Sequence, residues 1–272
     1  FSPKEEIIMK IGFIGCGNMA TAILKGILKS GEVVAADIIA SAKSDKTREK
    51  IEKELGIKKA DTNAQVVEFA DVVFLAVKPQ FLEGVLDEIK ASVKEDQIFI
   101  SIAPGKTLQW FADKLGEKTK VIRTMPNTPA MVGEGMTALC VNDLVTEEET
   151  ALAVKLCNTF GKTEVIPERL MDVVVGVSGS SPAYVFMFLE AMADAAVADG
   201  MPRAQAYKFA AQAVLGSAKL MLETGKHPGE LKDMVCSPAG TTIQAVRVLE
   251  EKGLRSAVFE AQTTCVNKAK GM

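Results

Sequence analysis

Three small residues near the start of the chain have the spacing of a phosphate-binding turn. Gly15, Gly17 and Ala20 follow a short apolar run, 10–15, and open a helical segment, 18–30. In this pattern the first glycine permits a tight turn, the second lets a pyrophosphate approach the backbone, and the small third residue lets helix and strand pack closely. The helix start adds free N–H groups and a positive dipole. In this strand–turn–helix context the pattern predicts a dinucleotide site; the alternative is a tight turn without a ligand.

The residues that follow the second strand indicate which dinucleotide is bound. A carboxylate that binds the ribose of NAD is expected about 20 residues after the glycines. Strand 38–41 instead ends at Ser41 and is followed by Ala42, Lys43 and Ser44. Hydroxyls and a cation suit the 2′-phosphate of NADPH, so we expect NADPH to be preferred, with NADH possible. The alternative is that Lys43 is a solvated loop charge.

Three further strands end in segments suited to line a ligand. The runs 71–77, 97–102 and 120–125 lead into Lys78 and Pro79, into small residues at 101–105, and into the stiff turn 125–129. In open α/β sheets, ligands lie beyond the carboxyl ends of the strands. We therefore expect Lys78 near the cofactor and the segment 101–105 near the nicotinamide. Asn127 and Thr128 could bond a ligand or cap a turn, and periodicity alone leaves a structural role open for each segment.

Two hydroxyl-rich segments in the second half of the chain, 178–184 and 236–242, precede apolar helices. N–H groups and hydroxyls at a helix start form a compact site for a carboxylate. The alternative is simple N-capping, by Ser178 or Ser181 in the first segment and by Ser237 in the second. The residues themselves leave both interpretations open.

Composition excludes several classes of protein. The chain has 272 residues, 48% of them apolar and 25% charged, which is typical of a folded globular protein. A net charge of −3 gives no electrostatic footprint for nucleic acid or an anionic membrane. The five cysteines form no CxxC pair and the one histidine is His227, so neither a metal site nor a Ser–His–Asp triad is expected. His227 precedes Pro228 at an expected helix start and is interpreted as a local structural residue.

No targeting or membrane segment is expected. No window approaches ~18 uninterrupted apolar residues, so we predict no membrane span and a cytoplasmic location. Residues 1–8 precede Met9 and are interpreted either as an added remnant or as a short natural extension.

The elements that position these residues fall into two parts. From 9 to 166, apolar strands alternate with helices at 18–30, 44–55, 79–91 and 107–115, which predicts an α/β domain with a doubly wound, mainly parallel sheet. From 167 to 272 we expect an all-α domain, with long helices over 181–199, 203–223, 239–252 and 254–270. The stretch 183–198 is apolar on almost every face. A helix of this kind must be buried all round, so we infer dimerisation through this domain.

Five segments together resemble the Δ1-pyrroline-5-carboxylate reductase family: 13–20, 74–80, 121–135, 178–197 and 227–243. The resemblance covers the chain from Met9 onward. It implies hydride transfer from NADPH or NADH to the imine carbon of pyrroline-5-carboxylate, which gives L-proline in the last step of proline biosynthesis. It also implies a Rossmann domain and a helical domain that interlocks with a partner chain, with dimers often assembling into decamers. The active site would lie between the cofactor of one chain and the helical domain of the dimer.

The resemblance also assigns site residues. It implies that Thr242 orients the substrate's ring nitrogen and donates the proton, as the catalytic residue. The substrate carboxylate is expected on Val235, Ser237, Gly240, Thr241 and Thr242, chiefly through backbone amides. The cofactor is expected on Ile14, Gly15, Cys16, Gly17, Asn18, Met19, Ser41, Lys43, Ser44, Asn63, Ala76, Val77, Lys78, Pro79, Ile102, Ala103 and Pro104.

Three positions depart from the family's pattern. Ser181 and Ala239 stand where the family usually has glycine, and Pro104 replaces a small residue beside the nicotinamide. A Cβ at 181 or 239 would strain the backbone if a positive φ were required. Proline at 104 removes an N–H from the loop.

Two other classes of protein are weighed against this interpretation. A β-hydroxyacid dehydrogenase or another imine reductase would share the two-domain plan, but the first group usually carries a catalytic lysine or aspartate at the start of its helical domain. Here the region 172–186 contains Asp172 and no lysine. A non-catalytic NADP(H)-binding sensor would need no carboxylate site, so the segment 237–242 argues against it.

Overall fold

The computed structural model describes residues 9–271, so the predictions for residues 1–8 lie outside the described part. The chain divides into two compact units, the first containing residues up to Gly179 together with the segment from Val266, and the second Ser180–Cys265. The segment after 167 joins the first unit because Met171 packs with Ala138 and Cys140 in a small buried cluster. The domain boundary at 166/167, drawn from the sequence, stays a prediction.

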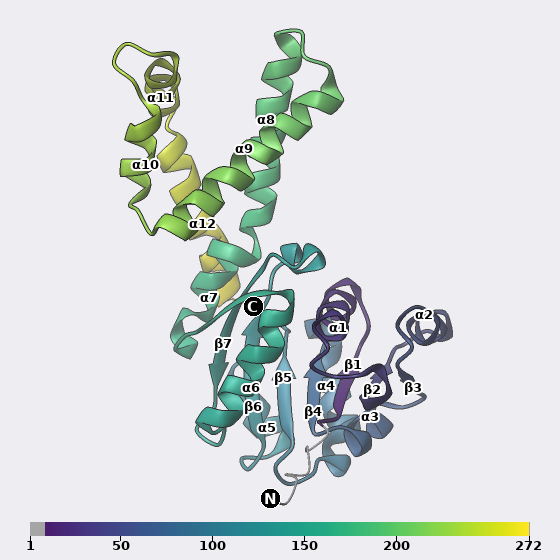
Figure 1. Ribbon diagram of the computed structural model, residues 1–272. Helices are drawn as coiled ribbons and strands as arrows, with labels where there is room; N and C mark the ends of the chain where they lie inside the picture. The colour runs from purple at the N-terminus through teal and green to yellow at the C-terminus, as the bar shows by residue number, and fades with distance from the viewer. Residues whose placement is uncertain (1–8, 272) are drawn as a thin grey trace, which may run out of the picture. The chain divides into compact units, whose positions relative to one another are not determined.

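The first unit is built on an eight-stranded sheet with the order β3-β2-β1-β4-β5-β6-β7-β8 (Figure 1). All neighbouring strands are parallel except β6 and β7. The chain reverses its direction of strand addition between β1 and β4, which makes the carboxyl edge there the ligand crevice of a doubly wound sheet. The strands are β1 (Ile11–Ile14), β2 (Ile38–Ser41), β3 (Lys58–Ala60), β4 (Val72–Leu75), β5 (Ile98–Ser101), β6 (Lys120–Met125), β7 (Gly135–Val141) and β8 (Gly161–Val165).

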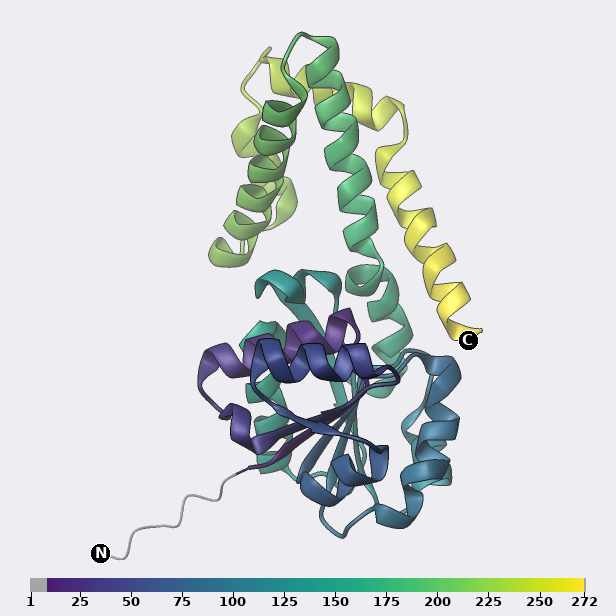
Figure 2. The same ribbon diagram turned by 90° about the vertical axis from the view of Figure 1, so that its right-hand side faces the viewer.

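Helices cover both faces of this sheet, as the apolar strands predict. On one face Phe13 and Phe74 stack with ring centroids 4.6 Å apart and pack with residues of α1 and α6. On the other face Phe99 packs with residues of α3, α4 and α5. The helices are α1 (Asn18–Ser30), α2 (Asp45–Leu55), α3 (Asn63–Phe69), α4 (Pro79–Ile89), α5 (Leu108–Leu115), α6 (Glu147–Cys157) and α7 (Met171–Val174). Figures 1 and 2 show the helices on either side of the sheet.

The sequence analysis omitted six elements: β3, β7, β8, α3, α6 and α7. The strands β3 and β8 lie at or near the edges of the sheet and expose most of their residues, so they lack the apolar run of a central strand. The strand β7 pairs antiparallel to β6, an arrangement that the strand–helix alternation does not signal.

The second unit consists of helices α8 (Ser181–Ala198), α9 (Arg203–Thr224), α10 (Pro228–Val235), α11 (Thr241–Glu251) and most of α12 (Leu254–Lys270). The helices α8 and α9 pack against each other. Within this single chain Ala193 is the one buried residue of α8, while Phe186 is 64% and Met187 70% exposed. The apolar faces predicted to be buried are therefore not covered by the chain's own residues.

One helical run, Glu168–Ala198, is long and apolar enough by composition to cross a membrane, with a mean hydropathy of 1.4. It is the single such run among residues 9–271. A helix that packs against a partner chain has the same composition, so this feature is weak evidence for a membrane, and the absence of a span stays a prediction.

Candidate functional site

The glycine turn lies at the crevice between β1 and β4. The N–H of Gly15 donates to the carbonyl of Ser41 at 3.1 Å, and the N–H of Ala76 donates to the carbonyl of Ile14 at 2.8 Å. Gly15 has φ +96°, and a Cβ there would lie 2.7 Å from the carbonyl oxygen of Ala76. Only glycine fits both constraints, and the turn brings the ends of β1, β2 and β4 together.

The start of α1 is open to a ligand. Gly17 precedes the helix, no side chain caps the free N–H groups, and the first turn carries no acidic residue. A Cβ on Gly17 would meet no atom within 4 Å, whereas Ala20 is 1% exposed against the sheet. Burial raises the pKa of the Cys16 thiol to about 12, so it stays neutral beside this anion site. The turn therefore fits the pyrophosphate of a dinucleotide in shape and in charge.

Two of the predicted cofactor residues bond each other. The hydroxyl of Ser41, at the end of β2, donates to Oδ1 of Asn63 at 2.6 Å, and Nδ2 of Asn63 donates to Oε2 of Glu88 at 2.8 Å. Asn63 begins α3 and Glu88 lies in α4. The network joins three elements at the edge where an adenosine ribose is expected.

Lys43 and Ser44 have different surroundings. Ser44 caps α2 and accepts from the N–H of Thr47 at 3.3 Å. Lys43 is exposed, and its Nζ lies 5.2 Å from the ring centroid of Phe81 at the start of α4. Lys78 immediately precedes Pro79, which starts the same helix. Lys43 is thus a cation held over an aromatic ring at the edge of the predicted cofactor site.

The turn 125–129 has a structural role. Nδ2 of Asn127 donates to the carbonyl of Ser178 at 3.0 Å, and its Oδ1 accepts from the N–H of Met136 at 2.8 Å. The side chain is buried, at 8% exposed. The sequence left open whether Asn127 bonds a ligand or has a structural role. These contacts show the structural role, since both ends of its side-chain amide bond the protein's own backbone.

The segment 178–184 is more helical than expected. Residues Val175–Gly179 form a π-helical turn, and α8 starts at Ser181. Ser180 precedes the helix without a side-chain cap, and the Ser178 hydroxyl donates back to the carbonyl of Val174 at 3.3 Å. The interpretation that Ser178 or Ser181 caps α8 is therefore wrong. Ser181 has no positive φ, so its departure from glycine causes no backbone strain.

The segment 236–242 forms a tight turn into α11. The N–H of Gly240 donates to the carbonyl of Ser237 at 3.0 Å, and Gly240 precedes the helix without any side-chain cap. Capping of this helix by Ser237 is therefore also wrong, and the N–H groups of its first turn remain available. Ala239 has φ +58°, so the departure from glycine places a Cβ in the left-handed region.

His227 has the predicted local role, because its Nδ1 caps α10 by accepting from the N–H of Gly229 at 3.0 Å. Among residues 9–271 no three His, Cys, Asp or Glu side chains are grouped as a metal would require.

Two contacts of predicted site residues were missed by the sequence analysis. Glu88 binds Asn63, and Phe81 underlies Lys43. Both lie on α4, far along the chain from their partners. No local pattern marks them, because only the tertiary fold brings α4 near Asn63 and Lys43.

A doubly wound sheet with an open glycine turn at its switch point, followed by an all-helical unit, defines a two-part NAD(P)-dependent oxidoreductase. The sequence matches a family described as pyrroline-5-carboxylate reductase dimerisation over residues 168–272, and one described as NADP oxidoreductase, coenzyme F420-dependent, over residues 10–105. It is 57% identical over 260 residues to the pyrroline-5-carboxylate reductase of Escherichia coli, covering 96% of this chain and 97% of that protein. The chain belongs to the pyrroline-5-carboxylate reductase family.

Solved structures of the same family resemble this chain over almost its whole length. A pyrroline-5-carboxylate reductase from Coxiella burnetii superposes with a TM-score of 0.91 at 35% identity, covering 97% of this chain and 98% of that one. A Plasmodium falciparum pyrroline carboxylate reductase, solved with NADP bound, gives 0.88 at 28% identity, with 97% of each chain covered. The chain is thus an oxidoreductase of proline biosynthesis that acts on a carbon–nitrogen double bond. The helical second unit belongs to the region matched by the dimerisation family, which supports self-association.

Proposed function

We propose that this chain reduces Δ1-pyrroline-5-carboxylate to L-proline with NADPH as the preferred hydride donor, and that the residues named in the sequence analysis form its two binding sites. The observation that carries the cofactor site is the open start of α1 behind Gly15 and Gly17. Its uncapped N–H groups and dipole attract the pyrophosphate.

The preference for NADPH rests on charge. Lys43 is exposed beside the end of β2, with Ser44 and the start of α2 next to it. Its ammonium attracts the 2′-phosphate, which NADH lacks. The bonded pair of Ser41 and Asn63 shapes the adjoining ribose pocket.

The nicotinamide then lies over the ends of β4 and β5. The residues there are Ala76, Val77, Lys78 and Pro79 after β4, and Ile102, Ala103 and Pro104 after β5. They are small or stiff for the most part, so the ring can approach the backbone closely.

The substrate carboxylate binds at the start of α11 in the second unit. The amides of Gly240 and Thr241 and the hydroxyls of Ser237 and Thr242 offer donors there, and Val235 adds an apolar wall. The supporting observations are the tight turn at Ser237–Gly240, the absence of a side-chain cap and the absence of acidic residues in the first turn. A carboxylate at such a helix start needs no arginine.

The proposed hydride transfer depends little on acidic or basic side chains. The reduced nicotinamide supplies the hydride when bound. The chain's own residues hold the imine carbon within ~3–3.5 Å of the donor position and exclude water. Thr242 orients the ring nitrogen and supplies its proton, directly or through water.

We further propose that the chain works in the cytoplasm as a dimer formed through the second unit, with dimers assembling into decamers. The exposed apolar side chains of α8 and α9, such as Phe186, Met187 and Phe209, support an interface there.

The test measures NADPH oxidation with pyrroline-5-carboxylate, then with NADH in its place, and identifies proline as the product. Thr242→Ala should lose roughly 5- to 150-fold in kcat/KM, the equivalent of one transition-state hydrogen bond of about 1–3 kcal/mol. Thr242→Ser keeps the hydroxyl and serves as the matched control. Wild-type kcat/KM in Thr242→Ala would exclude Thr242 as the proton donor, and NADPH binding without oxidation would exclude this substrate.

A further inference from the structure

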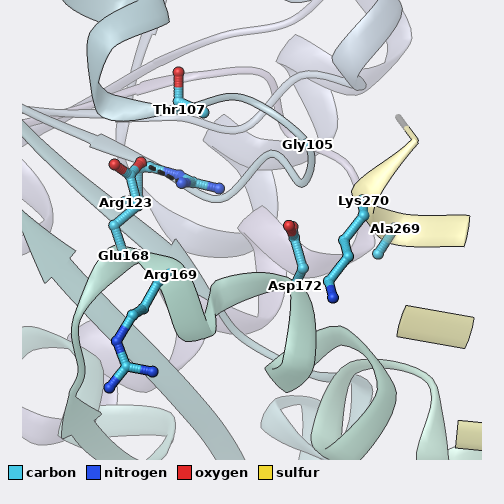
Figure 3. A pocket seen from close by; sticks show the side chains of 8 residues that line it. All are labelled: Gly105, Thr107, Arg123, Glu168, Arg169, Asp172, Ala269 and Lys270. Carbon is cyan, nitrogen blue, oxygen red and sulfur yellow. Dashed lines mark hydrogen bonds and ion pairs between the residues drawn. The ribbon is translucent and has the colours of Figure 1, made fainter. Parts of the chain in front are cut away.

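An ion pair between a buried arginine and a half-buried glutamate lies next to the loop that joins β5 to α5. The Arg123 guanidinium, on β6, donates to Oε1 of Glu168, and the same oxygen accepts from the backbone N–H of Leu108 at 2.7 Å. Arg123 is buried, at 7% exposed, and Glu168 is half-buried. Figure 3 shows the two side chains facing each other beside a cavity of about 370 Å³ that Gly105 and Thr107 also line.

The pair holds one end of loop 102–107, and the strand holds the other. At the strand end, the N–H of Ile102 donates to the carbonyl of Leu75 at 3.2 Å, and the Thr124 hydroxyl donates to the carbonyl of Ser101 at 3.0 Å. At the helix end, the anchor to Glu168 is on Leu108, the first residue of α5. Between these two anchors lie Ile102, Ala103 and Pro104, the residues proposed to face the nicotinamide.

Electrostatics make this anchor strong and specific. Arg123 is too deeply buried to be left without a counter-charge, because an unpaired buried cation is costly. The carboxylate of Glu168 also lies at the N-terminal end of α5, where the helix dipole favours an anion. One oxygen atom thereby ties β6, the segment 168–170 and the start of α5 together.

We propose that Arg123 and Glu168 are positioning residues for hydride transfer: they fix loop 102–107, and through it the height of the nicotinamide over the sheet. This rests on the proposed cofactor site. Neither residue touches the reacting atoms, so their loss slows the chemical step while the phosphate-binding turn still binds the cofactor. A displacement of about 1 Å at a reacting centre can cost about 100-fold in rate.

The chain carries its own reporter of this loop. Trp110, the one tryptophan of the sequence, lies in the first turn of α5. The backbone N–H of Trp110 donates to the Thr107 hydroxyl at 3.0 Å, and Nζ of Lys106 lies 4.8 Å from the Trp110 ring centroid. Fluorescence of Trp110 therefore reports loosening of the loop without any cofactor present.

The experiment compares Glu168→Gln with Glu149→Gln. Glu149 is a matched control, because its carboxylate also binds one cation, Lys120 at 2.7 Å, and one backbone N–H at a helix start, that of Thr146 at 2.9 Å. Lys120 opens β6, so this control anchor lies at the amino end of the strand, whereas loop 102–107 follows the carboxyl end of β5.

In Glu168→Gln we expect acrylamide quenching of Trp110 to rise, the single-turnover hydride-transfer rate to fall by about 10- to 100-fold, and the Kd for NADPH to change less than about 3-fold. The deuterium isotope effect on kcat should rise, because transfer becomes rate-limiting. Glu149→Gln should change none of these. Equal effects of the two variants on rate and on quenching would overturn the proposal, as would a parallel loss of cofactor binding and rate.

If Glu168→Gln does not fold, the double variant Arg123→Met with Glu168→Leu replaces the pair by apolar side chains, a change that folded proteins tolerate. It should show the same slow transfer and raised quenching; wild-type values for both would overturn the proposal. A wild-type protein that fails to reduce the imine would reject the proposed function, and the Trp110 comparison without cofactor would still test the anchor.

Discussion

The charge on Lys43 offers the sharpest test of how the chain chooses its cofactor. Lys43→Glu reverses an exposed charge that lies beside the end of β2 and over the ring of Phe81. The 2′-phosphate of NADPH carries about 1.5 to 2 negative charges, and NADH has none at this position. The substitution therefore replaces an attraction by a repulsion for one cofactor alone.

The size of the expected loss follows from the exposure of Lys43 to solvent. Two unit charges 4 Å apart interact by about 1 kcal/mol in water, and salt at physiological strength screens charges over about 8 Å. A nearly divalent phosphate and a reversal of sign multiply this energy several-fold, and screening by salt reduces it again. We therefore expect Lys43→Glu to lose about 2 kcal/mol of interaction with NADPH. That is roughly 30-fold in kcat/KM for NADPH, and this loss should shrink as salt is added.

The assay measures kcat/KM for NADPH and NADH at low and high salt. Lys46→Glu, an equal charge change in the first turn of α2, is the control for the general field of the protein. For Lys43→Glu, kcat/KM for NADH should change less than about 3-fold, within the range of the control. Equal losses with both cofactors would refute the reasoning, because they would show that Lys43 does not sense the 2′-phosphate.

Three further results are expected. Gly17→Ala should keep the wild-type Tm but weaken NADPH binding, since its Cβ occupies only open space. Gly15→Ala should lower the Tm as well, because its Cβ would clash with the carbonyl of Ala76. Calorimetry measures Tm and titration measures cofactor binding, and equal Tm values for the two variants would contradict the argument. Sedimentation at micromolar concentration should find no folded monomer, because the apolar faces of α8 and α9 are exposed in the single chain. Burial raises the pKa of the Cys157 thiol from 9.0 to about 12, so its contribution to stability is complete below about pH 9 and is lost as the pH rises towards 12. Urea unfolding should show a flatter alkaline decline in Cys157→Ala; an unchanged slope would show that this thiol is not responsible.

Much of the first unit could be predicted because its signals are local. The spacing of Gly15, Gly17 and Ala20 depends on one turn, and the apolar runs of the central strands depend on burial from both faces. Two helix starts were predicted as well, since the expected segments 44–55 and 107–115 begin at Ser44 and Thr107, which cap α2 and α5 in the structure. Strands at the sheet edge lack such signals, which is why β3 and β8 were missed.

The contacts of the site residues needed the tertiary structure. Asn63 and Glu88, or Arg123 and Glu168, are bonded across long stretches of chain, and no local pattern pairs one with the other. The residues alone left capping by Ser237 and a ligand site both open, and only the observed turn shows that Ser237 does not cap α11.

What the sequence by itself determined is therefore the class of fold, the phosphate-binding turn and, through resemblance, the family. These depend on short-range spacing and on apolar periodicity, which the chain carries wherever it is placed. Only the tertiary structure decided which polar side chains form hydrogen bonds within the protein and which remain exposed to solvent. Asn127 is consumed by such bonds, whereas Lys43 remains exposed, because packing between distant elements determines where each side chain finds its partners.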